Sequence, residues 1–410
     1  MPDAAQPVVT GIGVVAPNGL GTKEFWERTL DGRSGLDVIR RFDASGYPVQ
    51  VGGEVLDFDP GEHLPKRLLP QTDRMTQYAL AATDWALTDA GVETGELDEY
   101  VMGVVTASAS GGFEFGQREL EKLWGTGPDR VSAYQSFAWF YAVNTGQISI
   151  RNGMRGHSSV LVSEQAGGLD AAAHASRLLA RGTIHLAVTG GLDASLCPWG
   201  LVAQLPPGRL STVPDPRTAY RPFTPHASGY VAGEGGAILV VEPVEAARAR
   251  GAAKTYGRIA GHASTFDPRP GSGRPSALAP AIRGALDRAG LRPSEVDVVF
   301  ADAMGLPELD RAEAAALAEV FGPRGVPVTA PKTMTGRLYA GGAALDLACA
   351  LLSLQESVVP PTIGVPALAP AIELDLVRDQ PRELPIRNAL VVARGHGGFN
   401  SALVVQRTDQ

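Results

Sequence analysis

The order of strands and helices that this sequence predicts occurs twice along the chain. In each part, short β-branched runs alternate with longer segments of helical apolar spacing. Each part also closes with a glycine-rich turn that leads into an apolar strand, at Gly233–Val241 and at Gly395–Val405. A repeated plan over 410 residues is better explained by one duplicated fold than by unrelated domains. We therefore predict two similar α/β halves, residues 1–252 and residues 253–410.

Composition argues against several classes of protein. The net charge is −8 and no run of Lys or Arg forms a basic surface, so nucleic acid is not expected as a partner. The most apolar stretch, residues 340–354, is too short for a bilayer and contains Asp346. The histidines lack metal-ligand spacing, and Cys197 and Cys349 are too few for a disulfide framework or a metal cluster. With no leader segment expected in residues 1–7, we predict a cytoplasmic protein without a metal site.

One strand-to-helix junction has the form of a nucleophile site. Ser158–Val162 is predicted to be a strand, and an alanine-rich helix begins a few residues later. Such a turn holds one side chain above the free N–H groups of the helix, which lower a thiol pKa and stabilise an oxyanion. The residue there is Gln165, whose amide cannot form a thioester. Gln165 is either an ordinary polar turn residue or the replacement of a nucleophile, and neither Cys197 nor Cys349 lies where it would restore one.

Six segments spread over the chain match a known family. They are Val9–Val15, Gly112–Phe113, Ala138–Gln147, Glu164–Asp170, Gly229–Gly236 and Pro331–Arg337. Through them the chain resembles the condensing enzymes of the thiolase-like superfamily, from residue 8 to residue 407. Within that superfamily it is most similar to the ketosynthase beta subunits, or chain length factors, of bacterial type II aromatic polyketide synthases. The resemblance implies a thiolase-like α/β fold whose two halves form a layered α-β-α-β-α core.

The same resemblance accounts for the missing nucleophile. Active ketosynthases of this family carry a Cys-His-His triad, and the matching positions here hold Gln165, Asp302 and Arg337. Lys332 and Glu313 match the family's motifs, and we expect them to form a structural ion pair. Asp302 and Arg337 are expected to form a second pair in place of the two histidines.

The resemblance implies a non-catalytic subunit of a ketosynthase (acyltransferase) complex. Such a chain pairs with an active ketosynthase alpha subunit and shapes the tunnel that limits polyketide length during repeated condensation of malonyl-carrier protein, as in antibiotic or pigment biosynthesis. We expect no cofactor on the chain itself, because phosphopantetheine arrives on the acyl carrier protein. Condensing enzymes pair through the strand before the nucleophile, and interfaces concentrate aromatic residues. The predicted partner interface therefore comprises Phe137, Trp139, Phe140, Tyr141 and Val160.

Three residues are candidates for a chain-length gate. Phe113, Gly116 and Leu120 are spaced i, i+3 and i+7, so they share one face of a helix. On the implied function they line the far end of the tunnel at the subunit interface; the alternative is that they are simply core. Gly116 and Leu120 are small for gate positions, which predicts a product longer than an octaketide.

Two other functions stay open at this point. The chain could be a malonyl-carrier protein decarboxylase that supplies the acetyl primer, with the amide of Gln165 and the helix N-terminus polarising the thioester carbonyl. The anionic Asp302 argues against this, because it would repel the developing negative charge. A free-standing acyl-CoA-binding scaffold is the third possibility, and it would form a homodimer without a partner.

Overall fold

In the computed structural model, which describes residues 6–269 and 271–408, the predicted repeat appears as two groups of five main strands. The first group is β1 (Pro7–Ala16), β5 (Met102–Ala107), β6 (Ser158–Leu161), β7 (Leu186–Asp193) and β8 (Gly235–Pro243). The second group is β9 (Gly257–Phe266), β10 (Val298–Phe300), β11 (Pro327–Thr329), β15 (Asn388–Arg394) and β16 (Phe399–Gln406). Residues 1–5, on which the expectation of no leader segment partly rests, lie outside the described residues.

The two groups have the same topology. Their spatial orders are β6-β5-β7-β8-β1 and β11-β10-β15-β16-β9, so the third, second, fourth, fifth and first strands follow one another in both. The pairings of the second strand are parallel, and those of the fifth strand are antiparallel, in both groups. A short antiparallel contact of Val8 with Arg258 and of Val9 with Gly257 joins the groups into one 12-stranded sheet. This shared order confirms the prediction of two similar α/β halves.

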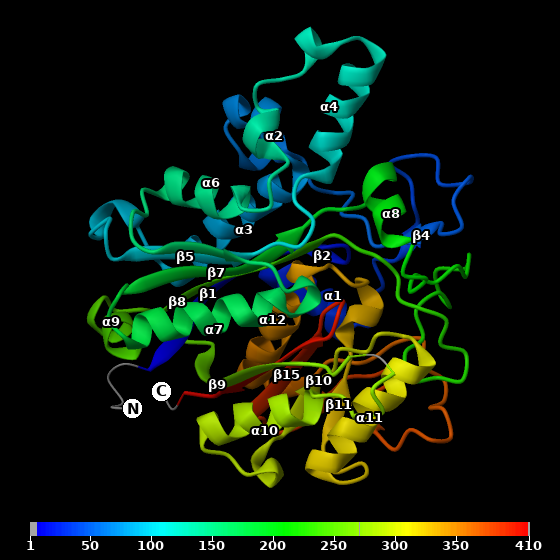
Figure 1. The fold of residues 1–410 in the computed structure, drawn as a ribbon. Helices are drawn as coiled ribbons and strands as arrows, with labels where there is room; N and C mark the ends of the chain where they lie inside the picture. The colour runs from blue at the N-terminus through cyan, green and yellow to red at the C-terminus, as the bar shows by residue number, and fades with distance from the viewer. Residues whose placement is uncertain (1–5, 270, 409–410) are drawn as a thin grey trace.

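Helices cover both outer faces of the strand groups and fill the space between them (Figure 1). The outer layers contain α3 (Arg74–Ala90) and α6 (Val143–Asn152) on the N-terminal half, and α10 (Leu278–Ala289) and α11 (Pro307–Phe321) on the C-terminal half. The central layer is formed by α7 (Gly167–Ala180) and α12 (Ala340–Glu356), which pack on each other. The predicted α-β-α-β-α arrangement is therefore present.

The central layer explains why one helix is apolar on every side. All residues of α12 from Ala340 to Leu354 are buried, as expected for a helix enclosed between two sheets. The approach of α7 to α12 is close enough to require glycine, because a Cβ atom on Gly168 would lie 2.5 Å from the backbone nitrogen of Ala344.

The remaining elements connect these layers. They are β2 (Gly19–Leu20), α1 (Thr22–Leu30), β3 (Asp37–Val38), β4 (Val51–Gly52), α2 (Pro60–His63), η2 (Lys66–Gln71), η3 (Thr94–Glu96), α4 (Phe113–Gly125), η4 (Pro128–Arg130), α5 (Gln135–Ala138), η5 (Glu164–Ala166), α8 (Pro198–Gln204), α9 (Val244–Ala249), η6 (Pro293–Glu295), η7 (Pro331–Met334), β12 (Val358–Val359), β13 (Asp375–Leu376) and β14 (Arg382–Glu383). The predicted division after residue 252 falls between α9 and β9 and stays a prediction. Within the described residues, no helix has both the length and the apolar character needed to cross a bilayer.

Candidate functional site

Gln165 lies at a sharp junction between β6 and α7. The short η5 turn places it there, and Glu164 before it has a left-handed backbone with φ 51°. The side chain of Gln165 is fully buried, and within the described residues neither atom of its amide has a hydrogen-bond partner. The start of α12 packs on this amide, since a Cβ atom on Gly342 would come within 2.2 Å of its Nε2. Gln165 is therefore not an exposed turn residue but a buried polar group at the predicted elbow.

Asp302 and Arg337 form the ion pair that the sequence predicts. Nη1 of Arg337 lies 3.0 Å from Oδ1 of Asp302 and donates to the Asp302 carbonyl at 2.9 Å, while Nη2 donates to the carbonyl of Arg394 at 2.9 Å. Both side chains are buried. Burial disfavours the charge on Arg337, but Asp302 and then Glu164 outweigh it, and the pKa of Arg337 is raised. The guanidinium thus stays charged and committed to its carboxylate.

The predicted ion pair between Lys332 and Glu313 is wrong. Nζ of Lys332 lies 2.7 Å from Oδ2 of Asp346 in α12 and donates to the Ala301 carbonyl at 2.5 Å. Glu313 instead accepts hydrogen bonds from the backbone N–H groups of Asp302, at 2.7 Å, and Ala303, at 2.8 Å. The physical reason is that Glu313 braces the loop after β10, so its oxygens already serve two backbone donors.

Asp346 is the partner that the sequence analysis missed. The signal was a single carboxylate inside an otherwise apolar helix, because such a group must find a cation when the helix is buried. Burial raises the pKa of Asp346, and Lys332 opposes that shift. Burial and, next, the charge of Asp302 likewise raise the pKa of Glu313, to about 7, against the opposing charge of Arg394.

Three non-glycine residues beside the former triad positions have a left-handed backbone. They are Glu164 with φ 51°, Ala303 with φ 50° and Tyr339 with φ 51°. Backbone strain of this kind persists where the surroundings fix it, and it is concentrated at functional sites. The backbone is therefore held in a strained form beside Gln165, Asp302 and Arg337, whose side chains are an amide, a carboxylate and a guanidinium.

Neither cysteine supplies a replacement nucleophile. Both Cys197 and Cys349 are free and buried. Burial raises the pKa of the Cys197 thiol to about 11, although the Gly200 N–H opposes the shift, and it raises the pKa of Cys349 well above its ordinary value. Within the described residues, no three His, Cys, Asp or Glu side chains gather as they would around a metal ion.

The three gate candidates lie on α4, and the structure adds Trp199 to them. The Phe113 ring stacks on the Trp199 ring with centroids 4.9 Å apart, and a Cβ atom on Gly116 would lie 2.8 Å from Trp199 Cζ3. The side chain of Gln117 accepts a hydrogen bond from the Trp199 N–H at 2.9 Å, which fixes the start of α8. Leu120 is half-buried. In the single chain, Trp199 therefore fills the space that the missing side chain of Gly116 leaves.

The predicted interface residues lie on an exposed part of the N-terminal half. Within the described residues β6 is the last strand on its side of the sheet, and Val160 on it is half-buried. Trp139, Phe140 and Tyr141 are exposed by 43%, 40% and 41%, which is a large apolar surface for aromatic side chains. Phe137 differs from them, because it is half-buried against the N-terminal core. The assignment of these residues to a partner interface stays a prediction.

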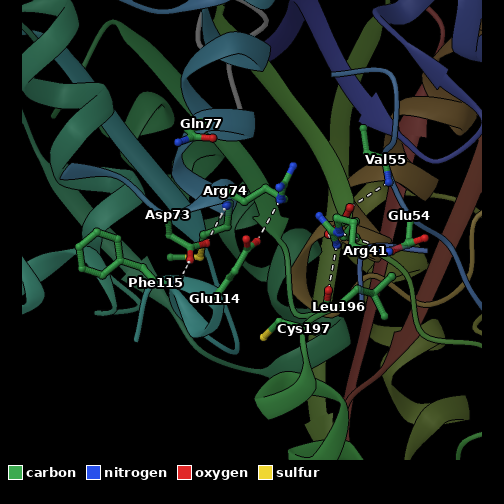
Figure 2. A network of polar contacts seen from close by, with 12 residues as sticks. Arg41, Glu54, Val55, Asp73, Arg74, Gln77, Glu114, Phe115, Leu196 and Cys197 are labelled. Carbon is green, nitrogen blue, oxygen red and sulfur yellow. Dashed lines mark hydrogen bonds and ion pairs between the residues drawn. The ribbon is translucent and has the colours of Figure 1, made fainter. Parts of the chain in front are cut away.

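A second polar network, absent from the sequence analysis, lies at the base of α4 (Figure 2). Arg41 Nη2 lies 2.5 Å from Glu234 Oε2, and its Nε lies 3.4 Å from Glu54 Oε1. Close by, Arg74 Nε lies 3.0 Å from Glu114 Oε2. Arg74 and Glu114 thus join the N-termini of α3 and α4, while Arg41, Glu54 and Glu234 join the segments around β4 and before β8.

Comparisons with known proteins agree with this geometry. The model of the beta-ketoacyl synthase N-terminal domain matches residues 6–247, and that of the C-terminal domain matches residues 256–366. The chain is 70% identical over 403 residues to the tetracenomycin polyketide synthase ketoacyl synthase beta subunit of Streptomyces glaucescens, covering 98% of each chain.

Two solved structures have the same fold. One is the ishigamide ketosynthase/chain length factor, with a TM-score of 0.90, 28% identity, and coverage of 98% of this chain and 99% of that one. The other is a type II acyl-carrier protein in complex with its ketosynthase bound to the hexaketide, with a TM-score of 0.88, 27% identity, and coverage of 98% and 99%. The chain therefore belongs to the beta-ketoacyl synthase family, in the group of polyketide synthase ketoacyl synthase beta subunits.

Proposed function

We propose that this chain is a non-catalytic chain length factor that pairs with a ketosynthase alpha subunit and sets the length of the polyketide. The observation that carries the proposal is the closed Asp302–Arg337 pair, buried where an active enzyme of the family has its two histidines. With Gln165 at the nucleophile position, these three residues offer neither a thiolate nor an imidazole for carbon–carbon bond formation. The reacting cysteine then belongs to the partner.

The surface of the N-terminal half supports a large partner contact. Among the described strands β6 pairs only with β5, so it is an edge strand, and the exposed aromatic side chains Trp139, Phe140 and Tyr141 are the type enriched in interface cores. The relative from the ishigamide pathway is described as a ketosynthase/chain length factor, and the other structure contains a carrier protein. We infer the same two partners for this chain.

The proposed function also accounts for the cofactor, whereas the location is a separate prediction. Phosphopantetheine arrives on the acyl carrier protein, and this chain holds no cofactor of its own. A cytoplasmic location stays a prediction that rests on cysteine usage, because Cys197 and Cys349 are both free thiols in a buried setting.

Product length in a reconstituted complex tests the function. The chain is co-expressed with its ketosynthase alpha subunit and carrier protein, and the released polyketides are identified by mass spectrometry. Gly116→Met is expected to shorten the product by at least one two-carbon unit, because the new side chain collides with Trp199 and must displace it toward the proposed tunnel. Gly125→Met is the matched control: it lies on the same helix, and a Cβ atom there meets nothing within 4 Å. An unchanged product from Gly116→Met would overturn the proposal.

Decarboxylation by Gln165 stays a second candidate, favoured by one observation. The buried amide has no hydrogen-bond partner within the described residues, so it is free to donate to a bound carbonyl group at the start of α7. The test is incubation of the complex, with the partner's cysteine replaced by alanine, with malonyl-carrier protein. Acetyl-carrier protein that forms with Gln165 and not with Gln165→Ala would establish this activity. We expect little of it, because no histidine is present at positions 302 and 337 to stabilise an enolate, and the Arg337 guanidinium is already bound to Asp302.

A further inference from the structure

Asp73 provides caps for two different helices. It is the N-cap residue of α3, and its Oδ1 accepts a hydrogen bond from the N–H of Met75 at 2.9 Å. Its Oδ2 accepts a second one from the N–H of Phe115, in the first turn of α4, at 2.8 Å. The N-cap of α4 itself is Gly112, which has no side chain to satisfy a free N–H group of that helix. A residue 42 positions away from Phe115 therefore supplies the missing cap.

The start of α4 also packs directly on Asp73. A Cβ atom on Gly112 would lie 2.8 Å from Asp73 Cβ and 2.2 Å from the carbonyl oxygen of Ala138, so only glycine allows this approach. Next to Asp73, Arg74 forms its ion pair with Glu114, at 3.0 Å. The N-cap and the first residue of α3 thus hold two successive residues of α4 (Figure 2).

The two helices differ in how firmly the rest of the chain holds them. Most of α3 is buried, including Met75 and Tyr78, and it packs on β1 and β8. In α4 only Phe115, Gly116 and Glu119 are buried, and the helix projects from the body of the molecule (Figure 1). The contacts at its first turn, together with the hydrogen bonds of Gln117 with the Trp199 N–H and of Glu119 with the Ser132 N–H, therefore hold α4 in position.

We propose that Asp73 is a positioning residue that fixes α4, and with it Phe113 and Gly116, against Trp199, and thereby narrows the range of product lengths. This inference rests on the proposed function. Asp73 itself is fully buried, so it acts on the product only through the position of α4. A shift of α4 by one helical residue would move it about 1.5 Å along its axis. A shift of that size would change which length of polyketide fits against α4.

The variant Asp73→Ser separates the two caps. Serine is a good N-cap, so its hydroxyl can still accept the Met75 N–H, but its single short oxygen cannot also serve Phe115. Asp59→Ser is the matched control, because Asp59 caps α2 through the Gly61 N–H at 2.8 Å and has no second helix to hold. Both variants are made in the complex with the ketosynthase alpha subunit.

Two measurements decide the matter. Hydrogen exchange read by mass spectrometry should become roughly tenfold faster in the peptide containing Phe115 for Asp73→Ser, as expected when one buried hydrogen bond is lost, and not for Asp59→Ser. The product distribution should broaden to two or more polyketide lengths at similar total yield. A single product length, unchanged from wild type, would overturn the positioning role whatever the exchange rate.

Two further outcomes are separable. Where Asp73→Ser does not copurify with the partner, the same measurements on Asp73→Asn decide, since an amide keeps one acceptor oxygen in nearly the same shape. If Gly116→Met also leaves product length unchanged, the proposed function fails. If Gly116→Met shortens the product and the Asp73 variants leave it unchanged, only the positioning role fails.

Discussion

Nζ of Lys332 lies 2.7 Å from Oδ2 of Asp346, so the cation at the start of η7 is tied to the central helix α12. Both side chains are only 3% exposed. Removing one partner from a buried pair leaves an uncompensated charge and costs about 3–5 kcal/mol, whereas replacing both by apolar groups of similar size is often neutral. The pair therefore joins η7 to the middle layer of the fold.

For this pair we expect Lys332→Met and Asp346→Leu to destabilise the complex strongly as single changes, and much less as a double change. The thermal unfolding midpoint of the complex measures this. Glu313→Gln serves as a comparison, because Glu313 makes no ion pair with Lys332 and feels it only as one of several charges, so its coupling to Lys332→Met should be weaker than that of Asp346→Leu. Additive effects of Lys332→Met and Asp346→Leu would contradict the assignment.

The elbow should not regain condensation through one substitution. Gln165→Cys restores a thiol, but the other two triad positions still hold Asp302 and Arg337, so no imidazole is available to stabilise the enolate. In a complex whose partner cysteine is replaced by alanine, we expect polyketide formation to stay at background. Product formation above that background would mean that the chain needs no histidine at these positions.

Trp199 and Gly116 should behave as a coupled pair in stability. Gly116→Leu forces the new side chain against Trp199 Cζ3, which a Cβ atom already approaches at 2.8 Å, and overpacking of this kind costs about 1–3 kcal/mol. Trp199→Leu alone leaves a cavity beside Phe113 and also destabilises. The double variant should recover part of both losses in a thermal midpoint measurement, whereas strict additivity would show that the residues do not share this space.

Stability should depend on pH through Glu313. Burial raises its pKa from 4.5 to about 7, so the folded state binds a proton more tightly than the unfolded state. The free energy of unfolding therefore falls as pH rises from about 4.5 to 7, by about 3 kcal/mol for this group. Residue 313 cannot titrate in Glu313→Gln, so the thermal midpoint of the variant relative to wild type should rise as the pH increases from about 5 to 7. A difference that is constant over that range would contradict the prediction.

The aromatic surface should contribute to partner binding. Trp139→Ala is expected to weaken the affinity for the ketosynthase alpha subunit by about tenfold or more, as for an aromatic residue near the centre of an interface. Trp124→Ala is the control, because Trp124 is 83% exposed at the far end of α4 and outside the predicted interface. Affinity measured by titration of labelled subunits distinguishes them; equal effects would place the interface elsewhere.

The sequence predicted the duplicated α/β plan and the position of the elbow, because both depend on local periodicity and glycine placement. It also predicted the pairing of Asp302 with Arg337, since two opposite charges replaced two adjacent catalytic groups. The predicted ion-pair partner of Lys332 was wrong. The sequence does not show that Glu313 already accepts hydrogen bonds from the backbone, which leaves Asp346 as the partner of Lys332. The contact between Trp199 and Gly116 could not be predicted for a related reason, because it joins two helices that are far apart in the sequence.

The buried Asp302–Arg337 pair also affects how this lineage can change. Changing only Arg337 to histidine removes the guanidinium that neutralises the buried Asp302, and changing only Asp302 to histidine removes the carboxylate that neutralises the buried Arg337. Each first step toward a working enzyme is thus a loss of stability with no gain in chemistry. Because each single change at the pair lowers stability, the specialisation of this subunit is difficult to reverse by single mutations.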